Sequence, residues 1–248
     1  TKALSSFNIG GATDEEKLKE AISAIEEAMQ SSEYQSDSKA WSTRGDIYSA
    51  VSTQHMSAMI LDENHEIIDA EAPFKAYESY KKGLEFAEKN WQTRDALKGL
   101  SAAASNLNSM GATSYDAQEY GKAYAAFKAM IEIHDLLKAN EEKSMMDDPD
   151  TYNNQLYMTG LSALYNDDLK AAEPLFTELK DREFEQAAVY DALYRINEES
   201  NPDLAVQYLT EGREKFPEET SLLFTEINYY LRAGKMDILE TKLKEAIQ

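Results

Sequence analysis

The feature that most constrains the fold of this chain is a period of 34 residues in its C-terminal half. Apolar or small residues follow Val189 at fixed offsets, and the pattern begins again at Leu223. The first copy comprises Val189, Ala192, Leu193, Ile196, Ala205, Leu209 and Gly212. Offsets of 3, 4 and 7 residues share one helix face, so two such faces per period indicate a helix–turn–helix unit that stacks on its copies. The sequence therefore predicts an all-α solenoid of stacked antiparallel helix pairs.

Further copies lie upstream of this half. One begins at Leu107 and another at Leu156, and a glycine stands at the same place in both, as Gly111 and Gly160. A small residue there allows two helices to approach closely. Turn-prone residues separate the two helices of the last three units, at 166–168, 200–203 and 233–235.

A fifth copy is divided by an insertion, since Ala76 follows Trp41 by 35 residues where 16 are expected, which leaves 19 extra residues. Residues 49–61 contain no Gly or Pro and are expected to prolong the first helix, while 62–66 and 71–73 are expected to be loops. The insertion is too apolar for a free linker and is expected to fold back onto a neighbouring repeat. Its apolar residues are Met56, Met59, Ile60, Leu61, Ile67 and Ile68.

The N-terminal segment carries one more helix. Thr13 and Glu16 form a capping-box pattern before an amphipathic stretch from Leu18 to Ala28, which resembles the second half of a repeat. Residues 1–11 are expected to be a remnant of its first half. The chain is thus predicted to be one array, with a partial repeat at 1–36 and repeats at about 38–90 (insertion 50–73), 92–140, 150–184, 185–219 and 220–248.

In these motifs the chain resembles tetratricopeptide repeat (TPR) proteins over residues 13–248. The resemblance is carried by Trp41-x-x-Arg44-Gly45-x-x-Tyr48, Met110-Gly111 with Tyr120 and Ala123, Gly160 with Ala172, and Ala205 with Pro217. Segments 212–217 and 228–231 further resemble the exported TPR proteins of Gram-negative bacteria. The chain departs from the family at Leu193, where a small residue is preferred, and at Glu226, where an apolar one is preferred. The resemblance implies a right-handed α-α superhelix that binds proteins without catalysis.

Composition narrows the possible partners. The net charge is −21 and no Lys/Arg cluster is present, so nucleic acid and anionic membrane surfaces are not expected to bind. No apolar run approaches the roughly 20 residues that span a bilayer. The chain has no cysteine, which excludes disulfides, thiolate zinc sites and cysteine nucleophiles.

No catalytic, metal or cofactor constellation is recognised. The histidines His55, His65 and His134 are scattered and are expected on helix surfaces or loops. The acidic stretch 147–150 lacks the Gly and distal Glu of a calcium loop, and is read as a linker that caps a helix starting near Thr151. The chain is therefore predicted not to be an enzyme, and a hydrolase with groove carboxylates is kept as a third alternative.

Function is expected on the first helices, which by resemblance line a concave face. The candidate residues lie next to the packing positions: Asn108, Tyr115, Asn154, Tyr157, Leu161, Tyr165, Tyr190, Tyr194, Phe224 and Asn228. Asparagine can pair with a peptide backbone, and tyrosine offers apolar area with a polar tip, so an extended protein or peptide segment is the predicted partner. The alternative is that the aromatic residues fill a wide interface between helices.

A cochaperone role is not expected. TPR proteins that bind chaperone tails hold a C-terminal carboxylate with lysine, arginine and asparagine side chains. The corresponding positions here are Asn108, Asn154, Tyr157 and Met158, with no lysine or arginine among them.

The two ends of the chain leave alternatives open. An apolar stripe near the C-terminus comprises Ile238, Leu239, Leu243, Ala246 and Ile247, whereas a repeat array needs a polar outer face at its end. We expect the natural protein to continue beyond Gln248; the alternative is that the stripe is buried on a partner or a second copy. Thr1 in place of an initiator Met fits a removed signal peptide or a tag, and we favour export to the periplasm. The second function considered is a structural or oligomerisation subunit of a cell-envelope assembly.

Overall fold

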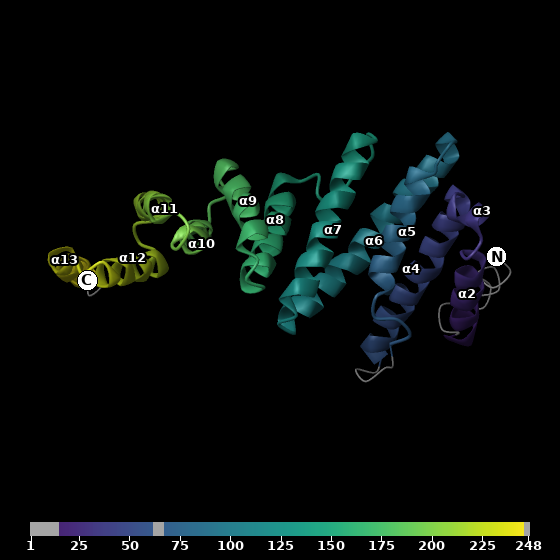
Figure 1. Ribbon diagram of the computed structural model, residues 1–248, viewed down its shortest axis with the longest axis horizontal. Coiled ribbons are helices and arrows are strands. Elements are labelled where there is room, and N and C mark those ends of the chain that lie inside the picture. Colours follow the sequence, from purple (N-terminus) through teal and green to yellow (C-terminus); the bar gives the residue numbers. More distant parts are fainter. Residues whose placement is uncertain (1–14, 62–66, 246–248) are drawn as a thin grey trace. The chain divides into compact units, whose positions relative to one another are not determined.

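The computed structural model describes residues 15–61 and 67–245, and these residues form helices and turns with no strand (Figure 1). The prediction of an all-α chain is confirmed. The chain divides into two compact units, here called the N-terminal unit (Thr1–Asp148) and the C-terminal unit (Pro149–Gln248). The prediction of one continuous array remains a prediction.

Each unit is built from consecutive helices. The N-terminal unit contains α2 (Glu15–Ala28), α3 (Ser32–Gln35), α4 (Ser38–Leu61), α5 (Ala72–Glu85), α6 (Asn90–Asp116) and α7 (Tyr120–Ala139). The C-terminal unit contains α8 (Pro149–Tyr165), α9 (Leu169–Asp181), α10 (Ala187–Asn197), α11 (Pro202–Lys215), α12 (Thr220–Arg232) and α13 (Met236–Glu245).

From α4 onward the helices pack as successive pairs, α4 with α5, α6 with α7, α8 with α9, α10 with α11 and α12 with α13. The pairs span residues 38–85, 90–139, 149–181, 187–215 and 220–245. The positions picked out by the period are interior: Leu107, Leu156, Val189 and Leu223 are all buried. The apolar faces expected from helical spacing are therefore the faces on which the pairs pack.

A glycine on the first helix meets an aromatic ring on the second in three pairs. These contacts are Gly45 with Tyr80, Gly111 with Phe127 and Gly160 with Phe176. A Cβ atom at position 111 would lie 2.5 Å from Cε1 of Phe127, closer than van der Waals contact permits. The ring therefore needs glycine beneath it, and the contact fixes how closely the two helices approach.

The α10/α11 pair reverses this arrangement. Leu193 occupies the place of the glycine on the first helix, and Gly212 on the second helix receives Tyr190 instead. A Cβ atom at position 212 would lie 2.7 Å from Cβ of Tyr190. The departure at Leu193 noted in the sequence is thus matched by a close contact at a different point of the same pair.

The insertion differs in part from expectation. As predicted, residues 49–61 prolong α4, but α5 already begins at Ala72, with Pro73 in its first turn, where 71–73 was expected to be a loop. Proline is favoured in the first turn because its missing N–H is not needed there. Met56 and Ile67 are exposed, so the packing predicted for them is not found. Residues 62–66 and the side chains of 59–61 lie outside the described residues.

Two other boundaries were predicted. Buried Leu18 and Ile25 confirm the amphipathic helix near the N-terminus, while its proposed cap at Thr13 and residues 1–11 lie outside the described residues. The helix expected near Thr151 begins at Pro149, again with proline in the first turn. Asp147 does not cap it; its Oδ1 pairs with Nζ of Lys138 at 3.0 Å, near the end of α7.

Replacing Gly111 with alanine tests the ring-on-glycine contact. Alanine favours an isolated helix by about 1 kcal/mol, but overpacking a rigid ring costs about 1–3 kcal/mol. We expect Gly111→Ala to lower the free energy of unfolding and the urea midpoint measured by far-UV circular dichroism. In a Phe127→Leu background, where the ring is absent, the same change should be neutral or stabilising. A stabilising Gly111→Ala in the otherwise unchanged chain would contradict the account.

Candidate functional site

The predicted site residues fall into two groups. Asn108 and Tyr115 lie on α6 in the N-terminal unit, where Asn108 is exposed and Tyr115 packs edge-on against Tyr120 with ring centroids 5.4 Å apart. The remaining eight lie on α8, α10 and α12 of the C-terminal unit. The larger group therefore belongs to the C-terminal unit, in which α10 packs against α12.

Helix α8 contributes a partly open row. Asn154 and Tyr165 are exposed, and Leu161 is half-buried. Tyr157 is also half-buried, because its ring packs against Phe176 at 6.2 Å and Phe184 at 5.9 Å between centroids. Burial, and then the charges of Tyr165 and Asp191, raise the pKa of Tyr157 above its ordinary value, so its hydroxyl is neutral and can donate.

Tyr190 and Tyr194 on α10 are interior residues, each only 6% exposed. Tyr190 packs on Gly212 and against the ring of Phe216, with centroids 5.9 Å apart. Burial, and then Glu198, raise the pKa of Tyr194. Both were expected to line an open surface, and this expectation is wrong. Their burial instead fits the alternative, in which aromatic residues fill an interface between helices.

Sequence reasoning missed the cause of this burial. Phe184 and Phe216 each follow the second helix of a pair and cover a tyrosine of the first, Tyr157 and Tyr190 respectively. The signal was a phenylalanine that recurs just after successive second helices, in the second case directly before Pro217.

Helix α12 presents the most open apolar residues of the predicted set. Phe224 is 59% exposed, and Leu231, two turns further on, is 52% exposed. Asn228 lies exposed between them, so the three residues share one face at offsets of four and three. Leu231 was not predicted, although the same helical spacing would have found it.

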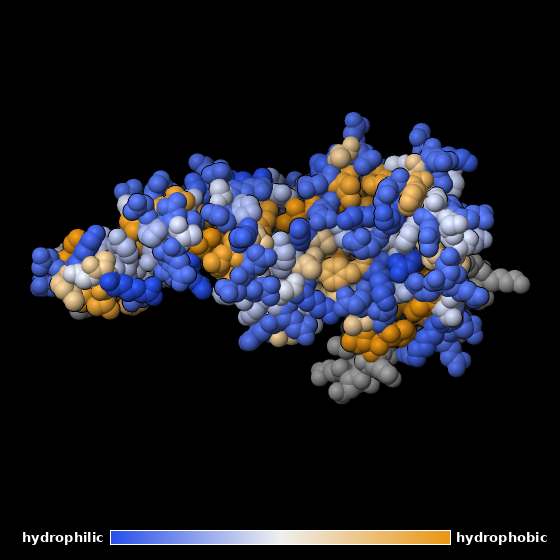
Figure 2. All heavy atoms as spheres, viewed as in Figure 1, coloured by the Kyte–Doolittle hydropathy of each residue, from blue (hydrophilic) through white to orange (hydrophobic). Residues whose placement is uncertain are grey.

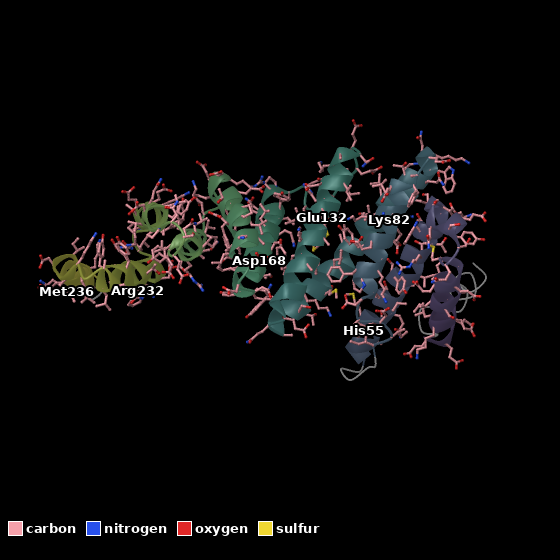
Figure 3. The ribbon with its side chains drawn as sticks, viewed as in Figure 1. His55, Lys82, Glu132, Asp168, Arg232 and Met236 are labelled. Carbon is pink, nitrogen blue, oxygen red and sulfur yellow. The ribbon has the colours of Figure 1, made fainter. Side chains whose placement is uncertain are left out.

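Helices α10 and α12 stack in a fixed register. Oγ1 of Thr225 donates to Oδ1 of Asp191 at 2.7 Å, and Nη1 of Arg232 lies 3.1 Å from Oε2 of Glu198. Both contacts join residues 34 positions apart. Asp191 of α10 and its C-cap residue Glu198 therefore each face the residue of α12 that lies one period later in the sequence (Arg232 is labelled in Figure 3).

We call the open part of these three helices the first-helix surface. It comprises Asn154, Tyr157, Leu161, Tyr165, Asp191, Phe224, Asn228 and Leu231.

A second apolar region lies on α13. Leu239 is buried against Leu223 and Ile227, whereas Ile238 and Leu243 are exposed. Met236 at the start of the helix is exposed as well, and apolar atoms are visible at this end of the C-terminal unit (Figures 2 and 3). Ala246 and Ile247, the rest of the predicted stripe, lie outside the described residues.

The N-terminal unit carries a different candidate, an open hollow of about 540 Å³ bordered by α2, α4 and α5. Its size is within the range of about 300–1,000 Å³ typical of small-molecule sites. It is lined by Glu26, Met29, Gln30, Gln35, Trp41, Arg44, Glu78, Lys82 and Phe86.

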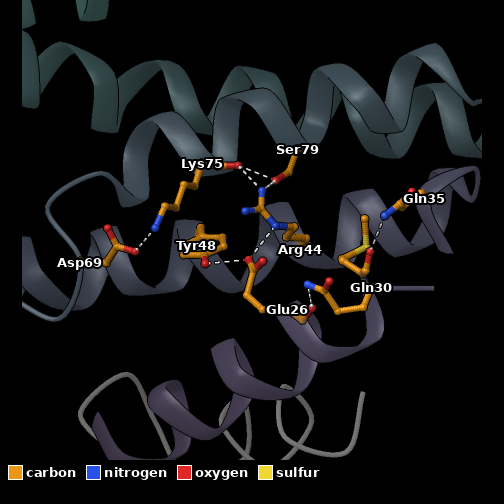
Figure 4. A network of polar contacts seen from close by, with 9 residues as sticks. Glu26, Gln30, Gln35, Arg44, Tyr48, Asp69, Lys75 and Ser79 are labelled. Atoms are coloured by element: carbon orange, nitrogen blue, oxygen red, sulfur yellow. Dashed lines mark hydrogen bonds and ion pairs between the residues drawn. The ribbon is translucent and has the colours of Figure 1, made fainter. Parts of the chain in front are cut away.

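The polar groups of this hollow pair with one another (Figure 4). Nε of Arg44 donates to Oε1 of Glu26 at 2.8 Å, and its Nη1 donates to Oγ of Ser79 at 2.6 Å. The hydroxyl of Tyr48 donates to the same Glu26 oxygen, and the guanidinium lies 4.9 Å from the Tyr48 ring. Nε1 of Trp41 donates to a backbone carbonyl of α3. Because charge-assisted bonds of this kind are strong, the network serves to fasten α2 to α4 and α5.

Within residues 15–61 and 67–245, no group of three His, Asp or Glu side chains could hold a metal ion. His55 and His134 are half-buried on α4 and α7, and His65 lies outside these ranges. None of the helices in the same ranges is long and apolar enough to cross a membrane.

Comparison with protein-family models gives no match, and comparison with curated proteins finds no similar sequence.

Proposed function

We propose that this chain is a non-enzymatic scaffold of the TPR type, which binds an extended protein or peptide segment along the first-helix surface. The stacking of α10 on α12 at an interval of 34 residues supports a repeating superhelix. The ring-on-glycine contacts at Gly111 and Gly160 support it too, since they recur at the same place in successive pairs. By the same resemblance, the scaffold acts in a bacterial cell envelope.

The observation that carries the proposal is the face of α12 formed by Phe224, Asn228 and Leu231. Two large apolar side chains more than half exposed, with an amide between them, are suited to a ligand that offers both apolar side chains and backbone hydrogen bonds. Exposed apolar residues clustered in this way are typical of interaction sites rather than of ordinary surface.

Tyr157 is a poor probe of this function, because its ring packs on Phe176 and Phe184 and its loss would disturb the core. Phe224 and Asn228 are exposed, and exposed substitutions usually change stability by less than about 0.5 kcal/mol. They allow binding to be tested separately from folding.

A random peptide library displayed on phage, selected against the full chain, provides the ligands for this test. We expect Phe224→Ala with Asn228→Ala to weaken binding of the selected peptides by about tenfold or more, because buried aromatic anchors dominate such interfaces. The melting temperature should hardly change. The measurement is fluorescence anisotropy with labelled peptide.

Leu169→Ala is the matched control, since Leu169 is an exposed apolar residue on α9, a second helix. It should bind the peptides as the unchanged chain does. Equal loss of binding in Leu169→Ala, or full binding by the double variant, would contradict the assignment of the surface.

The alternative function, a structural subunit that assembles with copies of itself, is favoured by the exposed residues of α13. Ile238 and Leu243 offer apolar area without a visible cover in the described chain. Under this alternative, sedimentation velocity should show a mass that rises with concentration, and Ile238→Glu with Leu243→Glu should abolish the rise. A mass independent of concentration, in the unchanged chain, would rule this alternative out.

A further inference from the structure

Asp191 occupies a special place on the first-helix surface, because its carboxylate bonds to the next first helix, α12. Its Oδ1 accepts a hydrogen bond from Thr225 of α12 at 2.7 Å. Its charge also raises the pKa of Tyr157 on α8, after the larger effects of burial and of Tyr165. Asp191 follows Tyr157 by the same interval that separates it from Thr225, so the three residues form one row across the unit.

None of the described residues provides a cation for this carboxylate. Glu198, the C-cap residue of α10, is paired with Arg232 of α12 at 3.1 Å. Asp191 faces α12 in the same register, but there it meets the hydroxyl of Thr225 in place of a basic side chain. Among the described residues no Lys or Arg forms an ion pair with Asp191, although Arg195 lies one turn away on the same helix.

A half-buried carboxylate without a counter-ion is ready to accept more hydrogen bonds. An ionised Asp has about four acceptor sites, and the Thr225 hydroxyl uses one of them. On α12, exposed Phe224 directly precedes Thr225 and exposed Asn228 follows Thr225 by three residues. A cationic group next to an apolar group is the ligand that complements this combination, and a chain of net charge −21 attracts such a ligand from a distance.

We propose that Asp191 binds the side chain of a lysine or arginine in an extended peptide, and that an adjacent apolar residue of the peptide packs on Phe224. Thr225 is a positioning residue, which orients the carboxylate through its hydroxyl. This inference rests on the proposed function and adds to it the chemistry of the partner: a basic, apolar segment rather than an acidic tail.

The test uses peptides selected against the full chain from a random display library. We expect them to contain Lys or Arg next to an apolar residue more often than the unselected library does. Replacing that basic residue with Gln should weaken binding by about tenfold. This loss lies between those expected for a fully exposed and a fully buried ion pair. Affinity for the basic peptide should also fall as salt increases, since the pair is partly exposed.

Asp191→Asn connects the effect to one residue. The amide oxygen can still accept from Thr225, so folding should persist, as checked by thermal melting. This variant should bind the basic peptide about tenfold more weakly, and should bind the Gln peptide as the unchanged chain does. Asp203→Asn, which removes the same charge from α11, is the control and should bind both peptides normally. If Asp191→Asn lowers the melting temperature, Asp191→Ser replaces it.

The outcomes separate the two proposals. If peptides bind and Phe224→Ala weakens them, but they share no basic residue or ignore Asp191→Asn, the role of Asp191 is overturned while the surface stands. If Asp203→Asn weakens binding as much as Asp191→Asn, the effect is one of overall charge and the role of Asp191 is again overturned. If the library yields no binding peptide, both proposals fail.

Discussion

The contact of an aromatic ring with a glycine is the interaction on which the pairs α4/α5, α6/α7 and α8/α9 depend. It requires a residue without a side chain at one point of one helix and a flat ring at the facing point of the other, so it fixes both the separation and the register of a pair. In the N-terminal unit one ring serves two contacts, since Tyr80 of α5 lies against Gly45 of α4 and Gly99 of α6. Its hydroxyl then donates to Asp46 at 2.9 Å, so the buried polar end is satisfied.

First helices of neighbouring pairs also pack in a fixed register. In the C-terminal unit, α10 and α12 meet at an interval of 34 residues, and this brings a carboxylate of one helix against a hydroxyl or a guanidinium of the next. The pairing of Glu198 with Arg232 is complete within the chain, whereas Asp191 is left with a neutral partner. The same stacking that builds the unit therefore determines which side chains remain for a ligand.

Much of the fold could be predicted because helical packing leaves a periodic trace in the sequence. Spacing identified the interior faces, as at Leu156 and Val189, and the absence of Gly and Pro identified the long α4. The candidate site could be predicted from the sequence only in part. Spacing places Tyr190 and Phe224 alike next to a packing position, yet Phe216, which follows α11, covers Tyr190, while Phe224 is exposed. Asp191 belongs to no motif, and its significance comes only from which residue of α12 it meets.

The central claim is that a peptide binds along the first helices of the C-terminal unit. Hydrogen–deuterium exchange of the full chain, measured by mass spectrometry with and without a saturating selected peptide, tests this directly, because binding suppresses local opening where the ligand lies. We predict slower exchange in α8, α10 and α12, with α9 and α11 unchanged. Protection confined to α9, α11 or α13 would contradict the account.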